Sequence, residues 1–466
     1  MTIMTIELRH IPLPGMPALG ERPDVPLDEY DRRMQALYAQ AKSDWVIVYA
    51  DREHIANMMF LCNFDPRFEE ALLVLGPEGK RALLVGNEDL DYIRAVCKPI
   101  IDGVLCQSLS LMGQPRSTAP RLTDVLRGLG ITAGSRIGLV GWKYLEADEC
   151  DEGHDPAAPA FVPAMLVNAL RRVVGAAGTL IDVTHVLMHP AHGLKSHNSA
   201  AQIAAYAWAA GQSSQSVLRI VRGARPGMTE REAAGLMGYQ GDPFSCHMMM
   251  VAGSSADAPI VGLRSPSGRV LAEGDGVTTA VGYWGSLCAR AGLLRGTPDP
   301  AFVETYAAPY FNAIATWWQT LRIGVTGGEM HDAVMRALDG AAFKPALNPG
   351  HLIATDEWTH SPIRPGSAER IVSGMALQCD IIPAPMPPGL ALNCEDTVAI
   401  ADAQLRAELQ AQHPALWSQI EARRAFMREA LGIALADDVL PLSVAPAALP
   451  PFWLASDLVC TQISRT

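Results

Sequence analysis

The residues that could carry chemistry in this 466-residue chain lie on three successive apolar segments toward its C-terminal end. His351 follows a Pro-Gly pair, Asp380 closes the second segment, and Glu395 and Asp396 lie at the start of the third. An imidazole exchanges protons near neutral pH, and imidazole and carboxylate groups are also ligands for divalent metal ions. Acidic residues on apolar strands are rarely buried without a partner, so we expect a site rather than an unrelated buried polar network.

Helices are expected to frame these segments. Residues 200–222 carry apolar residues at helical spacing, and the next helix begins at Thr229, where Glu232 completes a capping box. A second helix pair is expected over residues 301–321 and 328–341, and apolar strands follow each pair. The pattern indicates an α+β fold and is compatible with an internal duplication.

The N-terminal half has a different pattern, in which strands alternate with helices. Apolar spacing predicts a helix that begins near Asp28 and another over residues 122–129. A turn with Gly and Pro over residues 76–79 predicts a hairpin between two strands. The alternation indicates an α/β domain with helices covering a mixed sheet. Buried strands are expected over residues 45–49, 71–75, 82–85 and 137–140.

Composition limits the class of protein and its partners. With 49% hydrophobic and 18% charged residues and no apolar run long enough to cross a bilayer, we expect a soluble globular protein without a membrane partner. A net charge of −12 argues against a nucleic-acid partner, because such binding relies on Lys and Arg. Nine scattered cysteines without a C-x-x-C pair, and no basic N-terminal signal region, indicate a cytoplasmic protein.

Five short motifs occur in an order that resembles the creatinase, prolidase and aminopeptidase P family, which has the pita-bread fold. They are Lys195-Ser196, Arg225-Pro226-Gly227-Met228-Thr229-Glu230, Gly274-Asp275, Gly350-His351 and Glu395-Asp396. The resemblance implies an α/β N-terminal domain of the creatinase type, an α+β pita-bread C-terminal domain and a homodimer. The expected parts are an N-terminal arm (1–27), the N-terminal domain (28–194), the pita-bread catalytic-type domain (195–402) and a C-terminal extension (403–466).

Three of the family's five metal ligands have a counterpart in this chain. Metalloenzymes of the family hold two divalent ions with two Asp, one His and two Glu, and the ions activate a water. His351 matches the His, and Asp380 and Glu395 stand where the two Glu are expected. The resemblance implies catalytic roles for these three residues. A single divalent metal ion held by the same three residues is the alternative to a site without cofactor.

The other positions of the family's sites are not retained. Ala280 stands where the first Asp is expected, and Leu287 or Cys288 stands at the second. This loss implies that no dinuclear metal centre forms, and the pattern is most similar to the metal-free creatinase branch. The catalytic His of creatinase also has no counterpart, because Ile260 occupies its position.

Further residues are candidates for contact with a substrate. His360 stands where the family often has a substrate-contacting His, and we expect it to be catalytic. Tyr283 and Trp284, in a turn that resembles the creatinase branch, are expected to bind substrate, as are His247 and Cys288. For His247 and Cys288 the alternative is ordinary core packing.

Other residues are expected to lie outside the site. Glu357, on the loop after His351, is expected to be solvated, and Asp356 beside it either adds to the acidic pocket or is solvated as well. Phe452 and Trp453, near the C-terminus, offer apolar surface that we expect to pack against a partner chain. A solvated interdomain linker is expected to carry His185, His189, His192 and His197.

The function expected from these observations is a creatinase-like, metal-independent hydrolase that cleaves a C–N or similar bond in a small cationic substrate. Acidic groups around Asp380 and Glu395 would favour a cation. One alternative is a metal-dependent Xaa-Pro aminopeptidase, which would need the missing ligands. The other is a non-catalytic pita-bread protein that binds a ligand or scaffolds a partner.

Overall fold

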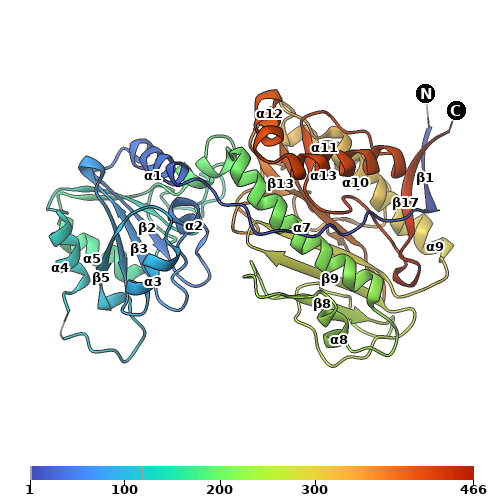
Figure 1. The fold of residues 1–466 in the computed structure, drawn as a ribbon, viewed down its shortest axis with the longest axis horizontal. Helices are drawn as coiled ribbons and strands as arrows, with labels where there is room; N and C mark the ends of the chain where they lie inside the picture. Colours follow the sequence, from blue (N-terminus) through green and yellow to red (C-terminus); the bar gives the residue numbers. More distant parts are fainter. Residues whose placement is uncertain (1–2, 118, 466) are drawn as a thin grey trace. The chain divides into compact units, whose positions relative to one another are not determined.

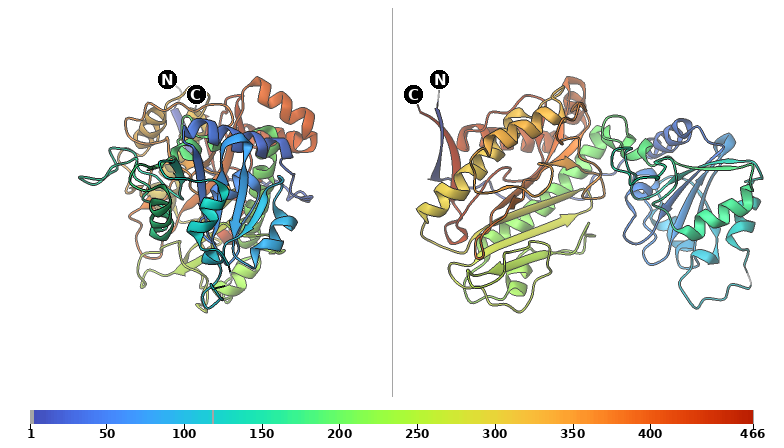
Figure 2. Two further views of the ribbon diagram at one scale, coloured as in Figure 1. Left: turned by 90° about the vertical axis from the view of Figure 1, so that its left-hand side faces the viewer. Right: turned by 180° about the vertical axis from the view of Figure 1, so that it is seen from behind.

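The computed structural model describes residues 3–117 and 119–465, which form two compact units (Figures 1 and 2). One unit runs from Val25 to Ser196, and the other joins the residues through Asp24 to those from His197 onward. Both chain ends therefore belong to one unit. There, strand β1 (Ile3–His10) pairs antiparallel with strand β17 (Leu458–Arg465).

The unit from Val25 to Ser196 has a six-stranded mixed sheet covered by helices on both faces, as the alternation of elements predicted. The strand order is β5-β4-β3-β2-β6-β7, with the predicted hairpin between β3 and β4. Helices α1 and α2 pack on one face and α4 and α5 on the other. The strands are β2 (Trp45–Ala50), β3 (Ala71–Leu75), β4 (Arg81–Val85), β5 (Asp102–Leu105), β6 (Arg136–Val140) and β7 (Thr179–Asp182). The helices are α1 (Leu27–Ala41), α2 (Ala56–Cys62), α3 (Asp89–Val96), α4 (Leu122–Leu129), α5 (Ala164–Val174) and α6 (His185–Met188).

The second unit is built on a seven-stranded sheet. Six strands follow the order β12-β13-β15-β10-β9-β8, and β16 pairs with β15. The sheet strands are β8 (Met249–Gly253), β9 (Gly276–Tyr283), β10 (Ser286–Leu293), β12 (His351–Leu352), β13 (Ala376–Cys379), β15 (Asn393–Ile400) and β16 (Val439–Pro441). A separate two-stranded sheet joins β11 (Lys344–Pro345) to β14 (Pro383–Ala384).

Helices of the second unit bury one face of this sheet. Helix α7 packs against β9 and β10, and α10 and α11 share a core with β13 and β15. The predicted capping box is present, since the Thr229 amide donates to the Glu232 carboxylate at 2.7 Å and the Glu232 amide donates to Thr229 Oγ1 at 3.1 Å. The helices are α7 (Ala200–Gly223), α8 (Glu230–Gly235), α9 (Pro300–Phe302), α10 (Ala308–Thr320), α11 (Gly327–Ala337), α12 (Ala403–Gln412) and α13 (Pro414–Ala425).

The C-terminal residues pass through the interior of their own unit. The Arg290 guanidinium holds this segment by donating to the carbonyls of Ala445 and Ala448 at 3.0 and 2.9 Å. Phe452 and Trp453 are fully buried, in clusters that also contain residues of α10 and α7. The expectation that these two aromatic residues pack against a partner chain is wrong, because the same chain already covers their apolar surface.

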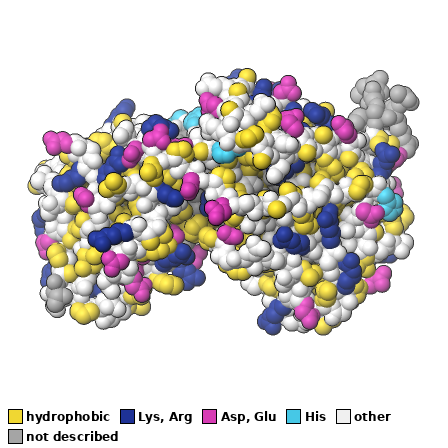
Figure 3. All heavy atoms as spheres, viewed as in Figure 1, with side chains coloured by type: hydrophobic (Ala, Val, Ile, Leu, Met, Phe, Trp, Pro, Cys, Tyr) yellow, Lys and Arg dark blue, Asp and Glu magenta, His cyan; other side chains and the backbone are white. Residues whose placement is uncertain are grey.

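None of the helices in the described residues combines the length and the apolar character that crossing a bilayer requires. On the face shown in Figure 3, acidic and basic side chains are interspersed over the described residues.

Candidate active site

Three of the predicted site residues converge on one face of the second unit's sheet. His351 lies opposite Gln378, which lies opposite Thr397 on the next strand. Side chains two residues apart on a strand point to the same face, so Asp380 and Glu395 project on the same side as His351. One possible ligand atom from each of His351, Asp380 and Glu395 lies within 4.8 Å of the others.

Burial changes the protonation of the two carboxyl groups in this cluster. Asp380 and Glu395 are each only 5% exposed, and one oxygen of each has no hydrogen-bond partner among the described residues. Burial raises the pKa of Asp380 to about 6, although His351 opposes this rise. Burial, and then the neighbouring Asp380, raise the pKa of Glu395 well above its usual value. The two carboxyl groups therefore keep protons at a higher pH than exposed carboxyl groups do.

Glu357 is a member of the site that sequence reasoning missed. Its Oε1 atom lies 3.1 Å from Nε2 of the buried His351, and the Trp358 ring stacks on the imidazole with centroids 4.2 Å apart. Burial, the largest single cause, lowers the pKa of His351, but the charge and hydrogen bond of Glu357, together with the charge of Asp380, outweigh burial, so the net shift of the pKa is upward. Glu357 keeps 30% of its side chain exposed, yet it is an ion-pair partner and not simply a solvated loop residue.

The loop between His351 and His360 explains how Glu357 reaches the imidazole. The Leu352 amide donates to the His360 carbonyl at 2.7 Å, and the Thr359 amide donates to the Leu352 carbonyl at 2.9 Å. This pairing closes the loop so that Glu357 returns to His351. The only sequence feature that could have pointed to this contact is the acidic-aromatic pair Glu357-Trp358. The distance of this pair from His351 along the chain does not by itself predict the turn.

An apolar row lies beside Glu395 on the same face of the sheet. Met249, Ala280, Ala289 and Glu395 lie directly opposite one another on four neighbouring strands. Leu287 projects on the same side as Ala289, and the apolar members of this row form a small cluster of their own. Of the two candidates for the second missing Asp, Leu287 therefore faces the site. Methyl and isobutyl groups supply no metal ligand, so the residues present do not fit a dinuclear centre.

The opposite face of the sheet carries three residues that were linked to the site by sequence. Cys288 is buried 3.8 Å from Asp396, and burial raises the pKa of its thiol well above the usual value. Asp396 binds the Arg290 guanidinium at 2.7 Å. Tyr283 is buried and packs against Phe244, with ring centroids 5.1 Å apart. Because side chains alternate along strands, these residues face away from His351.

The remaining candidates lie elsewhere. His247 is exposed, and its Nε2 atom lies 2.9 Å from the Leu263 carbonyl oxygen. Trp284 is partly buried in the turn between β9 and β10. His360 is partly buried where the loop after His351 closes, and it is not one of the three clustered ligands.

Of the histidines predicted in a linker, His185 and His189 lie at the two ends of α6, His192 follows shortly after, and His197 begins the second unit. His185 and His192 are exposed, and the His189 and His192 rings stack with centroids 3.6 Å apart. Within the described residues, the set of His351, Asp380 and Glu395 is the only group of His, Cys, Asp or Glu that is close enough to hold a metal ion.

Comparison with solved structures agrees with the predicted fold. No protein-family model and no curated protein matches the chain. The Xaa-Pro dipeptidase from Bacillus anthracis is 16% identical, with a TM-score of 0.58, over 81% of this chain and 96% of that chain. A prolidase from Thermococcus sibiricus is 14% identical, with a TM-score of 0.63, over 90% and 97% of the two chains. The X-Pro aminopeptidase from Thermotoga maritima is 14% identical, with a TM-score of 0.59, over 80% and 95%. The predicted α/β and pita-bread architecture is therefore confirmed.

Proposed function

We propose that this chain is a peptidase-type hydrolase that cleaves an amide or related C–N bond in a small substrate. The observation that carries the proposal is the buried cluster of His351, Asp380 and Glu395, whose possible ligand atoms lie within 4.8 Å of one another. The fold adds support, because solved proteins that share it include a Xaa-Pro dipeptidase and an X-Pro aminopeptidase.

When two neighbouring carboxyl groups differ in protonation state, one can act as the general base and the other as the general acid. Asp380, with a pKa of about 6, is largely ionised at neutral pH and would take a proton from the attacking water. Glu395 has a more strongly raised pKa, stays protonated, and would donate that proton to the leaving nitrogen. The His351 imidazolium, paired with Glu357, would hold Asp380 in its ionised form.

The surroundings favour a substrate with an amino group and an apolar part. A cationic group would be attracted to Asp380, and the row of Ala280, Ala289 and Met249 offers apolar contact beside Glu395. The proposal therefore keeps the small cationic substrate that the sequence indicated.

A single-metal enzyme is the second candidate, and the same cluster favours it. His351, Asp380 and Glu395 could hold one divalent ion, provided that Glu357 leaves Nε2 of His351. Such an ion would make a bound water more acidic. The proposed metal-free site differs from it in one measurable way, because activity would survive removal of divalent ions.

The test begins with a thermal-shift screen of small amines, guanidines and proline dipeptides to find a substrate. Turnover should then fall about a hundredfold or more in Asp380→Asn and Glu395→Gln, which remove one carboxyl group each. Glu408→Gln, on helix α12 and outside the cluster, is the matched control and should keep full turnover. Unchanged turnover in both site variants would refute the hydrolase and leave a binding protein.

Treatment with a chelator separates the two candidates. We expect turnover to persist after dialysis against EDTA, with less than one metal ion per chain by mass-spectrometric analysis. Activity that is lost on dialysis and restored by one equivalent of a divalent ion would establish the single-metal enzyme instead. A homodimer, from the family resemblance, and a cytoplasmic location, from the scattered cysteines, also belong to this proposal. Light scattering that gives the mass of one chain would contradict the dimer.

A further inference from the structure

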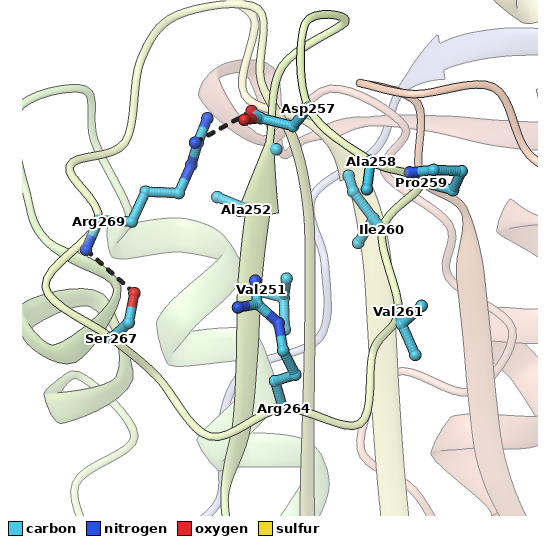
Figure 4. A pocket seen from close by; sticks show the side chains of 11 residues that line it. Val251, Ala252, Asp257, Ala258, Pro259, Ile260, Val261, Arg264, Ser267 and Arg269 are labelled. Carbon is cyan, nitrogen blue, oxygen red and sulfur yellow. Dashed lines mark hydrogen bonds and ion pairs between the residues drawn. The ribbon is translucent and has the colours of Figure 1, made fainter.

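A cavity of about 490 Å³ lies beside strand β8 and is lined by none of the acid–base residues proposed above. Its walls are β8 and the long loop that follows this strand (Figure 4). The residues that line it are Val251, Ala252, Gly253, Asp257, Ala258, Pro259, Ile260, Val261, Arg264, Ser267 and Arg269.

Hydrogen bonds to buried groups fix the walls of this cavity. The fully buried Glu230 carboxylate accepts from the Ala252 amide at 2.8 Å, and from the amide and hydroxyl of Ser267 at 2.8 and 2.6 Å. The Met250 amide donates to the Arg264 carbonyl at 3.2 Å. Loop and strand are thus tied together at Arg264 itself and, through Glu230, at Ser267, so the cavity is formed before a ligand arrives.

One guanidinium that lines the cavity, that of Arg264, makes no ion pair with the described residues. Arg269 lies 3.0 Å from Asp257 and 3.3 Å from the buried Asp275, so its charge is shared between two carboxylates. The guanidinium of Arg264, in contrast, has no hydrogen bond or ion pair with any described residue. Figure 4 shows this guanidinium turned along the cavity toward Val251.

Apolar surface adjoins that guanidinium. Pro259, Ile260 and Val261 line the cavity, and Val261 keeps 56% of its surface exposed. Leu263, next to Arg264 in the chain, is 69% exposed. A molecule that covered these side chains would remove apolar surface from water and gain free energy in proportion to the area.

We propose that this cavity binds the carboxylate of a small amphipathic molecule. The planar guanidinium of Arg264 presents two parallel N–H donors that match the two oxygens of a carboxylate. The apolar part of the ligand lies on Ile260 and Val261. One guanidinium without an ion pair, beside an apolar wall, fits a singly charged carboxylate better than a doubly charged phosphate.

Isothermal titration with hexanoate, hexanamide and acetate tests the proposal on the full chain. Hexanoate should bind at one site per chain. Hexanamide, which keeps the apolar chain but lacks the charge, should bind about tenfold more weakly or worse, the scale of a hydrogen bond to a charged group. Acetate should also bind more weakly, because it lacks the apolar chain.

Variants assign this binding to Arg264. Arg264→Gln should lower the affinity for hexanoate about tenfold or more. Arg264→Lys should have an affinity between those of the parent protein and Arg264→Gln, because lysine keeps the charge but lacks the planar pair of N–H donors. Arg428→Gln removes an exposed arginine that does not line the cavity and should bind hexanoate normally. The exposed position of Arg264 leaves folding unaffected, which thermal melts of each variant would verify.

Three results would overturn the proposal: no saturable binding of hexanoate, equal binding of hexanamide, or normal binding by Arg264→Gln. The inference does not rest on the proposed hydrolase. Glu395→Gln should bind hexanoate like the parent even where turnover is lost, so failure of one claim is distinguishable from failure of the other.

Discussion

Replacement of Glu357 by Gln should lower the pKa of His351. The substitution keeps the size of the side chain and its capacity for hydrogen bonding but removes the charge that lies 3.1 Å from Nε2. That charge is the leading cause of the upward shift of the His351 pKa, while burial acts in the opposite direction. Without it, the pKa of His351 should fall below its ordinary value, and the imidazole should be neutral at pH 7.

The size of the change follows from the geometry of the pair. Two opposite charges about 4 Å apart attract by about 4 kcal/mol at an effective dielectric constant of ~20, which corresponds to about 3 pKa units. The exposed part of Glu357 is screened by water, and Asp380 continues to favour the imidazolium. We therefore expect the pKa of His351 to fall by about 1–3 units.

Nuclear magnetic resonance of protein labelled with ¹³C at histidine measures this pKa directly. A titration between pH 5 and 9 would follow each ring in chelator-treated protein, and the signal missing from His351→Gln would identify the relevant resonance. Asp356→Asn is the matched control, because Asp356 lies on the same loop and its carboxylate accepts from the Thr359 hydroxyl at 3.2 Å.

Two outcomes would refute the reasoning. An unchanged His351 titration in Glu357→Gln would mean that the ion pair does not form in solution. An equal change in Asp356→Asn would mean that the loop's overall charge, and not contact with Glu357, sets the pKa.

Three further predictions follow from the buried charges and the apolar row. Arg290→Met leaves the Asp396 carboxylate buried without its cation, so the free energy of unfolding in urea should fall by about 3–5 kcal/mol, and adding Asp396→Leu should recover part of the loss. Folded Asp380 holds a proton that the unfolded chain releases, so stability should fall as pH rises from about 4 through 6, by about 3 kcal/mol in thermal melts, and Asp380→Asn should flatten this dependence. The double variant Ala280→Asp with Leu287→Asp should bind about two Mn²⁺ ions per chain by metal analysis, and a variant that binds none would show that the apolar row is not the missing half of a metal site.

Local signals in the sequence were sufficient for most elements of the fold. The capping box of Thr229 and Glu232 depends on residues three apart, and the helix it predicts is present. Apolar periodicity likewise predicted α1, where Tyr30, Met34 and Leu37 are buried. The convergence of His351, Asp380 and Glu395 could be predicted from the family resemblance, because the order of the motifs along the chain matches the order of strands in the family's fold.

Features that depend on pairing between distant segments could not be predicted from the sequence. Whether Leu287 or Cys288 faces the site follows from the opposition of Ala289 and Glu395, which fixes the face of every residue on β10. The contact of Glu357 with His351 depends on how the loop closes. Neither the strand register nor the loop closure is encoded by the spacing of residue types alone.

The burial of the C-terminal segment has a consequence for synthesis on the ribosome. The unit from Val25 to Ser196 is continuous in sequence, so it can fold while the rest of the chain is being made. The second unit cannot complete its fold at that stage, because β1 pairs with β17, and the Arg290 guanidinium donates to the carbonyls of Ala445 and Ala448. All of these partners lie near the C-terminal end of the chain. Until the last residues emerge, the nascent sheet exposes apolar surface that a chaperone could bind. A premature stop codon near the C-terminus would therefore remove interior contacts of the second unit, and not only a surface segment.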